Sequence, residues 1–135
     1  MAHPECLECV RCGREYPLDA YDRQCEPCAS DGIAANLTPR YGPTDSPTRD
    51  DLPTGPNSLW RYADHLPLTA DEAVTLGEGM TPMVEIDGFG HGQIHVKDES
   101  RNPTWSFKDR LATVAVSWAK KIGAPAIATS STGNA

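Results

Sequence analysis

The sequence predicts an α/β protein in which a parallel sheet with crossover helices follows a small metal-binding module. Two observations support this prediction. All five cysteines lie within the first 28 of 135 residues, and four of them form two closely spaced pairs. Further along the chain, an amphipathic helical pattern precedes a short apolar run, which is typical of a helix that connects two parallel strands.

The paired cysteines predict a structural zinc site. Cys9 and Cys12 form one pair, Cys25 and Cys28 form a second, and 12 residues separate the two pairs. Four thiolates can close a tetrahedral zinc sphere and leave no position open for a substrate. The alternatives are disulfides or redox thiols, and a shifted ligand set in which Cys6 replaces Cys9 or Cys12. Because so short a segment buries little apolar surface, its folding should depend on the metal.

Residues 31–57 predict a linker. They are rich in Pro, Gly, Thr and Asp, and five prolines interrupt any periodic pattern. Residues 59–66 restore apolar content, and their Trp60 and Tyr62 are expected to anchor the chain to the core.

Alternating apolar and polar residues predict a pair of strands at residues 83–86 and 93–97, joined by a glycine-rich turn. His95 falls on the polar face of this pair. His65 lies beside a Leu-Pro pair and His91 lies between glycines, so we expect surface positions for both rather than catalysis.

The helix that follows is predicted from the spacing of its apolar residues, which recur at steps of three and four. These residues are Leu111, Val114, Ala115, Trp118, Ala119 and Ile122. One apolar stripe should therefore face a sheet, while Lys120 and Lys121 should face solvent near the carboxyl end of the helix. Gly123 and Pro125 end the pattern.

Lys108 lies at the start of this helix. Ser106 followed by Asp109 resembles a capping box, which places Lys108 in the first turn. A partly buried lysine near the positive end of a helix is a good nucleophile for an aldehyde. The alternative for any lysine is a solvated residue at a helix end.

Residues 126–129 predict a short buried strand, and a small polar turn follows at residues 130–134. Ligands of open parallel sheets bind at the carboxyl ends of strands, where exposed amides at the start of a helix suit an anion. The alternative is a turn whose side chains only cap the next helix.

The charge balance excludes several partners. The chain has 12 Lys and Arg against 19 Asp and Glu, a net charge of -7, whereas nucleic-acid binding needs clustered basic residues.

No apolar run approaches the roughly 20 residues that cross a bilayer. The first residues also lack a basic segment followed by an apolar one. We expect a cytoplasmic protein without nucleic-acid or membrane partners.

Five ordered motifs resemble those of the fold type II pyridoxal-phosphate enzymes, and among these the threonine synthases. They are Leu-Trp-Arg-Tyr at 59–62, Gly-Glu-Gly-Met-Thr-Pro at 77–82, Val-Lys-Asp-Glu at 96–99, Asn-Pro-Thr-Trp-Ser-Phe-Lys-Asp-Arg at 102–110 and Ser-Thr-Gly-Asn at 131–134. Many threonine synthases also carry a short zinc ribbon near the amino terminus. Trp105 stands where they often carry glycine.

The resemblance implies roles for four residues. Lys108 would hold pyridoxal 5'-phosphate covalently and act as the catalytic base. Asn134 would donate a hydrogen bond to the phenolic oxygen of the cofactor, and Ser131 and Thr132 would receive the substrate carboxylate. Residues 58–135 would be the start of the pyridoxal-phosphate-dependent catalytic domain, after a zinc ribbon at 1–30 and a linker at 31–57.

The implied reaction converts O-phosphohomoserine and water to threonine and phosphate, a carbon-oxygen lyase reaction of threonine biosynthesis. Such enzymes are two to three times longer, and their glycine-rich phosphate cup has no counterpart in this sequence, so we expect this chain alone to be inactive. Family members are often dimers, which makes a homodimer the implied assembly. Two alternatives remain open: another fold type II enzyme, such as threonine dehydratase or cysteate synthase, and a zinc-ribbon interaction module.

Overall fold

The computed structural model describes the chain except for residues 1–3, 21–22, 43–47, 88–89, 91 and 132–135. The chain divides into two compact units. One consists of Met1–Leu52 with Asp64–Pro67, and the other of Pro53–Ala63 with Leu68–Ala135. The described residues form no helix that is long and apolar enough to span a membrane.

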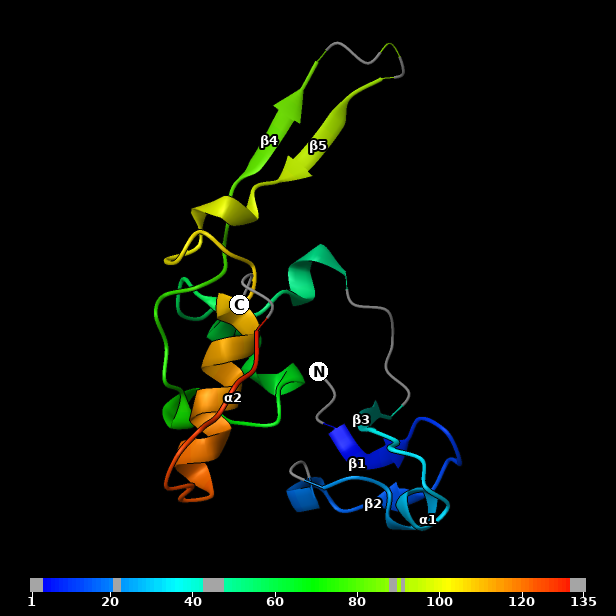
Figure 1. Cartoon of the computed structure of the whole chain (residues 1–135). Coiled ribbons are helices and arrows are strands. Elements are labelled where there is room, and N and C mark those ends of the chain that lie inside the picture. The colour runs from blue at the N-terminus through cyan, green and yellow to red at the C-terminus, as the bar shows by residue number, and fades with distance from the viewer. Residues whose placement is uncertain (1–3, 21–22, 43–47, 88–89, 91, 132–135) are drawn as a thin grey trace. The chain divides into compact units, whose positions relative to one another are not determined.

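The first unit contains a three-stranded antiparallel sheet and a short helix (Figure 1). β1 (Pro4–Cys9) lies between β2 (Glu15–Tyr16) and β3 (Leu37–Tyr41), and α1 (Glu26–Ser30) precedes β3. Buried cysteines dominate the apolar cluster of this unit that consists of Cys9, Cys25, Cys28 and Ala35, and Leu7 and Ala20 are buried as well. So small an apolar core supplies little stability of its own.

β3 lies within the segment that the sequence indicated as a linker. It pairs with β1 in a register that runs from Cys9 opposite Leu37 to Pro4 opposite Tyr41. Pro39 is accommodated because β3 is at the edge of the sheet, where the missing N–H group deprives no second neighbour of a hydrogen bond. The sheet of the first unit therefore extends past residue 30.

The second unit contains the predicted strand pair. β4 (Met83–Ile86) and β5 (Ile94–Lys97) are antiparallel, with Met83 opposite Lys97 and Ile86 opposite Ile94, which confirms the prediction (Figure 1). Both strands are largely exposed, and 60% of the Met83 surface is accessible. His95 is exposed as expected, and His91 lies outside the described residues.

The predicted helix is α2 (Asp109–Lys121), and it ends before Gly123, whose φ of 67° reverses the chain. The prediction that its apolar stripe is buried was wrong. Leu111 is 72% exposed and Ile122 is 49% exposed. The buried residues of α2 are instead polar, one turn apart on one face: Asp109, Thr113 and Ser117. Val114, Trp118 and Ala119 of the stripe are half-buried, and no sheet among the described residues covers the stripe.

The predicted strand at residues 126–129 is not formed, and these residues are exposed. A strand needs a neighbour to satisfy its backbone N–H and C=O groups, and no described strand pairs with this run. Both sheets among the described residues are antiparallel. The predicted parallel sheet is therefore not seen in this part of the chain.

Trp60 is buried with 2% of its surface exposed, which confirms the predicted anchor, and Tyr62 is half-buried. Both lie in one of several 3-10 segments of the described chain. These segments are Leu18–Ala20, Arg49–Asp51, Leu59–His65, Ala70–Glu72 and Glu99–Arg101.

Candidate metal centre and lysine site

The structure brings four cysteine sulfurs together in the first unit. The Sγ atoms of Cys9, Cys12, Cys25 and Cys28 all lie within 4.8 Å of one another. Cys9 Sγ is 3.8 Å from Cys28 Sγ, and Cys12 Sγ is 3.6 Å from Cys25 Sγ. A tetrahedral zinc ion with bonds of about 2.3 Å requires sulfurs about 3.8 Å apart. The donor set therefore fits a metal ion of this kind.

Two local turns hold the sulfurs in place. Directly after Cys12 the chain reverses at Gly13, whose φ of 70° favours glycine and whose N–H donates to the Cys9 carbonyl at 3.0 Å. The N–H of Arg11 points at the Cys9 sulfur at 3.4 Å. The second pair is fixed by α1, because Cys25 is its N-cap and Cys28 lies on its buried side.

Tyr16 makes an outer contact with this cluster. Its hydroxyl donates to Cys25 Sγ at 3.3 Å, and this hydrogen bond lowers the pKa of Cys25 to about 6. Burial raises the pKa of Cys28 to about 12. The thiolate form that a metal needs is thus favoured at Cys25 by a neighbouring donor, as is common around metal ligands.

Cys6 lies apart from the four-sulfur cluster. It is half-buried on β1, and all five cysteines are free thiols. The shifted ligand set with Cys6, and the pair of disulfides, do not match this arrangement. The four clustered cysteines could hold a metal ion.

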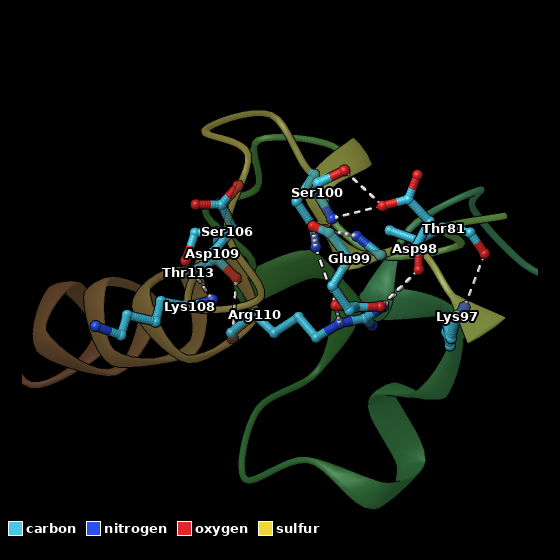
Figure 2. Close-up of polar contacts among 12 residues, drawn as sticks. Thr81, Lys97, Asp98, Glu99, Ser100, Ser106, Lys108, Asp109, Arg110 and Thr113 are labelled. Carbon is cyan, nitrogen blue, oxygen red and sulfur yellow. Dashed lines mark hydrogen bonds and ion pairs between the residues drawn. The ribbon is translucent and has the colours of Figure 1, made fainter. Parts of the chain in front are cut away.

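The lysine site lies in the second unit. Lys108 is the N-cap of α2, and its N–H donates to Ser106 Oγ at 3.2 Å (Figure 2). The side chain of Asp109 does not complete a capping box with Ser106. Its Oδ2 accepts from the N–H of Thr104 at 2.8 Å, and its Oδ1 accepts from the Thr104 hydroxyl. Asp109 therefore closes a loop around Lys108, because Thr104 offers it both a backbone and a side-chain donor.

The carboxylate of Glu99 binds three other residues beside this loop. Arg110 donates from Nε to Glu99 Oε2 and from Nη2 to Glu99 Oε1, both at 2.8 Å (Figure 2). Thr81 Oγ donates to Oε1 at 2.6 Å, and Asn102 Nδ2 donates to Oε2 at 3.0 Å. Lys97 Nζ donates to the carbonyl of Thr81 at 2.8 Å. Two-pronged pairing of guanidinium and carboxylate is strong and directional.

A second carboxylate, that of Glu78, is buried against the face of α2 that carries Thr113. Glu78 is fully buried, and its oxygens accept from the hydroxyls of Thr113 at 2.7 Å and Thr75 at 2.8 Å. The N–H of Leu76 also donates to it at 2.8 Å. These donors explain why the polar side chain of Thr113 is buried. An apolar side chain at this position would leave the Glu78 carboxylate without one of its hydrogen-bond donors.

Hydrogen bonds and ion pairing stabilise the charged forms of Glu99, Arg110 and Glu78. Hydrogen bonds from Arg110, then Thr81 and Asn102, lower the pKa of Glu99 to about 2. The same pair raises the pKa of Arg110 above its already high value. Burial works to raise the pKa of Glu78, but hydrogen bonds led by that from Thr113 lower it on balance. Both carboxylates stay ionised at neutral pH.

The predicted ligand residues divide into described and undescribed positions. Lys108 is half-buried at the start of α2, and Ser131 is exposed. Thr132 and Asn134 lie outside the described residues. No role for Glu99 or Asn102 was predicted from the sequence. The available signal for Glu99 was its place in the Val-Lys-Asp-Glu motif at 96–99, one of the motifs that carry the family resemblance.

Comparisons with known proteins match the part of the chain that contains Lys108. Residues 74–135 match the family described as "Pyridoxal-phosphate dependent enzyme". The chain is 38% identical to the threonine synthase of Methanosarcina acetivorans over 132 residues, which are 95% of this chain and 31% of that protein. It is 33% identical to the threonine synthase of Methanocaldococcus jannaschii over 131 residues, 93% of this chain and 32% of that protein.

A third relative covers less of the chain. The threonine synthase of Halalkalibacterium halodurans is 41% identical over 86 residues, which are 57% of this chain and 24% of that protein. No solved structure matches the chain. The chain spans about a third of the length of the first two curated relatives. The chain is similar to threonine synthases over most of its length, and its residues 74–135 match the pyridoxal-phosphate-dependent enzyme family.

Proposed function

We propose that the protein carrying this chain is a threonine synthase, which converts O-phosphohomoserine and water to threonine and phosphate. One observation carries the proposal: Lys108, the lysine of the family-like segment, lies at the N-cap position of α2. Hydrogen bonds from Thr104 to Asp109 and from Lys108 to Ser106 hold the backbone around it. Similarity to threonine synthases over more than nine-tenths of the chain supports it.

The surroundings of Lys108 fit a lysine that binds pyridoxal phosphate. It supplies a primary amine at the positive end of a 13-residue helix, and it is half-buried, so a ligand can reach it. A lysine is the residue type that binds aldehydes covalently. Asn134 is proposed to donate to the phenolic oxygen of the cofactor, and Ser131 and Thr132 to receive the carboxylate of the substrate.

The residues of this chain then have defined tasks. Lys108 holds the cofactor and afterwards moves protons at Cα and Cβ of the substrate. Phosphate leaves Cγ, and water adds at Cβ. When bound, pyridoxal phosphate supplies an electron sink for the negative charge that develops at the substrate carbons. Rigid backbone around Lys108 keeps the amine within reach of both carbons.

The test uses the whole protein, loaded with pyridoxal phosphate. Borohydride reduction followed by peptide mapping should place a pyridoxyl group on Lys108, and Lys108→Ala should lose it together with phosphate release from O-phosphohomoserine. Lys120→Ala, at the exposed far end of the same helix, is the matched control and should keep both. Absence of the adduct from Lys108 would refute the proposal. Ammonia release from serine or threonine in place of phosphate release would indicate a dehydratase.

We further propose that the four clustered cysteines hold one structural zinc ion. The support is the all-thiolate donor set, the sulfur separations close to those of a zinc tetrahedron, and a unit whose core is otherwise small. Four protein ligands close the coordination sphere, so the ion stabilises the fold and takes no part in the reaction. A reducing cytoplasm, the proposed location, would keep the thiols available.

Metal analysis of cysteine variants tests this site. The unchanged protein should carry one zinc per chain, and Cys25→Ser should lose it because three ligands bind far more weakly than four. Cys6→Ser is the matched control, since Cys6 lies on the same sheet but outside the cluster, and it should retain the metal. Loss of zinc in Cys6→Ser with retention in Cys25→Ser would show that the ligand set is wrong.

The parallel sheet is also proposed for the whole protein, with residues 126–129 as one of its strands. Its support is unpartnered apolar surface: Leu111 is 72% exposed on α2, and Ile127 is 54% exposed in the run itself. In a strand-helix-strand unit both side chains would be covered by neighbouring strands.

A further inference from the structure

We propose that Glu99 is a positioning residue for Lys108, and that it acts through the guanidinium of Arg110 and the amide of Asn102. This inference rests on the proposed function, because it assumes that Lys108 is the lysine that reacts.

The Glu99 carboxylate accepts four hydrogen bonds from three residues, Thr81, Asn102 and Arg110. Oε1 accepts from Arg110 Nη2 at 2.8 Å and from Thr81 Oγ at 2.6 Å. Oε2 accepts from Arg110 Nε at 2.8 Å and from Asn102 Nδ2 at 3.0 Å. Two parallel bonds from one guanidinium fix both the distance and the plane of the pair, which a single bond does not.

Asn102 and Arg110 are the two ends of the segment that contains Lys108. Asn102 is 2% exposed, and its Oδ1 accepts from the N–H of Gly79 at 2.9 Å while its Nδ2 donates to the Glu99 carbonyl at 2.9 Å. One carboxylate therefore holds the segment at its beginning, through Asn102, and at its end, through Arg110. Figure 2 shows the Arg110 end.

Within these ends, the backbone has little remaining freedom. Asp109, which is 4% exposed, binds back to Thr104, and the N–H of Lys108 binds to Ser106. The direction in which the Lys108 side chain leaves the backbone is thus set by contacts that begin at Glu99. A displacement of about 1 Å at a reacting group can cost roughly 100-fold in rate.

The far end of α2 offers a matched ion pair for comparison. Lys121 Nζ lies 3.0 Å from Glu72 Oε1, and the two side chains are 41% and 33% exposed. Glu72→Gln removes the same charge from a partner of the same helix. It does so at the opposite end from Lys108, so it reports the loss of a helix ion pair without a change near the amine.

The experiment compares Glu99→Gln with Glu72→Gln in the whole protein loaded with pyridoxal phosphate. Glu99→Gln should lower kcat about 10- to 100-fold, with KM changed less than about twofold, because the amine is misplaced while substrate contacts persist. It should also shift the pH midpoint of the visible absorbance of the bound cofactor and speed amide exchange across residues 102–110. Glu72→Gln should change none of these. Equal behaviour of the two variants would overturn the inference.

Borohydride mapping separates this inference from the proposed function. An unchanged protein without a pyridoxyl group on Lys108 refutes the function itself. A normal adduct, with Glu99→Gln behaving like Glu72→Gln, refutes only the positioning role. Should Glu99→Gln fail to fold, Thr81→Val removes one of the four donors and keeps the ion pair. It should lower kcat about threefold to tenfold and speed the same exchange, since one lost hydrogen bond is worth about 1 kcal/mol. An unchanged kcat and exchange rate in Thr81→Val would overturn the inference.

Discussion

At the scale of single residues, two nearby positions, 77 and 79, require glycine for different physical reasons. Gly77 has a φ of 78° and open space where a Cβ would lie. Gly79 has a φ of 93°, and a Cβ there would lie 2.9 Å from the backbone N of Leu59 and 3.0 Å from Nη1 of Arg110. The first position needs only backbone freedom, whereas the second also needs the absence of a side chain.

This difference predicts unequal effects of alanine. Gly77→Ala should destabilise the fold by about 1–2 kcal/mol, the cost of a left-handed backbone for a residue with a Cβ. Gly79→Ala should cost at least about 2 kcal/mol more, because the Leu59 backbone must move and Arg110 is pushed from Glu99. Urea unfolding of both variants measures the two values. Equal losses would show that the approach to Leu59 is looser than described.

The low pKa of Glu99 predicts a pH dependence. Its folded-state pKa, about 2, lies below the ordinary 4.5, so the ionised pair stabilises the fold fully above about pH 4.5. This contribution is lost as the pH falls through about 2. The stability difference between the unchanged protein and Glu99→Gln should therefore shrink between pH 4.5 and 2.

Denaturant midpoints of both proteins at a series of pH values measure this difference. Glu85→Gln, on the exposed strand β4, is the control and should track the unchanged protein throughout. A difference that stays constant down to pH 2 would contradict the proposed ionisation.

At the scale of elements, α2 reverses the usual relation between polarity and burial. Its inner face carries Thr113 and Ser117, and Ser117 is fully buried. Ser117 Oγ accepts from the N–H of Val74 at 2.8 Å and donates to the Thr113 carbonyl at 2.6 Å. This face holds loop backbone and the Glu78 carboxylate in place, so hydrogen bonds rather than apolar contacts determine which residues are inside.

Because the buried face of α2 is polar, truncating a small polar side chain on that face should lower the free energy of unfolding more than truncating a large apolar side chain on the exposed face. In this 135-residue chain, Ser117→Ala should cost about 1–3 kcal/mol because the N–H of Val74 loses its acceptor. Leu111→Ala should stay within about 0.5 kcal/mol, since Leu111 is 72% exposed. Chemical denaturation of both variants tests the ranking. A larger loss for Leu111→Ala would mean that the apolar stripe is covered in solution.

At the scale of the whole molecule, the two units depend on different interactions. The first has a core of cysteines and alanine, and the second is held by charged and polar networks around α2. All three tryptophans lie in the second unit, at Trp60, Trp105 and Trp118. Tryptophan fluorescence therefore reports on the second unit.

This distribution predicts the outcome of metal removal. A strong zinc chelator should unfold Met1–Leu52, seen as rapid amide exchange in β1 and β3, because the apolar core of this unit is small and the proposed zinc ion would supply much of its stability. Tryptophan emission should remain unchanged during the same treatment. Cys6→Ser should respond like the unchanged protein. A red shift of the emission on chelation would show that the second unit needs the first.

Several features could be predicted from the sequence because they depend on local spacing. The strand pair follows from alternation around a glycine-rich turn, and α2 follows from its periodicity and from Gly123. Cysteine spacing indicated the four residues that the structure brings together. Each of these depends on residues close in sequence, so the pattern itself carries the geometry.

Other features could not be predicted because they join distant segments. β3 looked like a linker until its pairing with β1 appeared, since an edge strand tolerates the proline that argued against it. Asp109 was expected to cap with Ser106, but a nearby Thr104 offered two donors and took its carboxylate. The buried face of α2 was misjudged because periodicity locates an apolar stripe but does not supply the sheet that would cover it.

The sequence alone determined the two cysteine pairs, the hairpin, and a lysine at the start of a helix, because short-range sterics and hydrogen bonding decide these. Only the tertiary structure decided what surrounds that lysine. Thr81, Glu99 and Arg110 come from separate parts of the chain, and no spacing rule relates them. Their meeting depends on how loops pack against α2, where desolvated charges must find partners, and that requirement acts through space rather than along the chain.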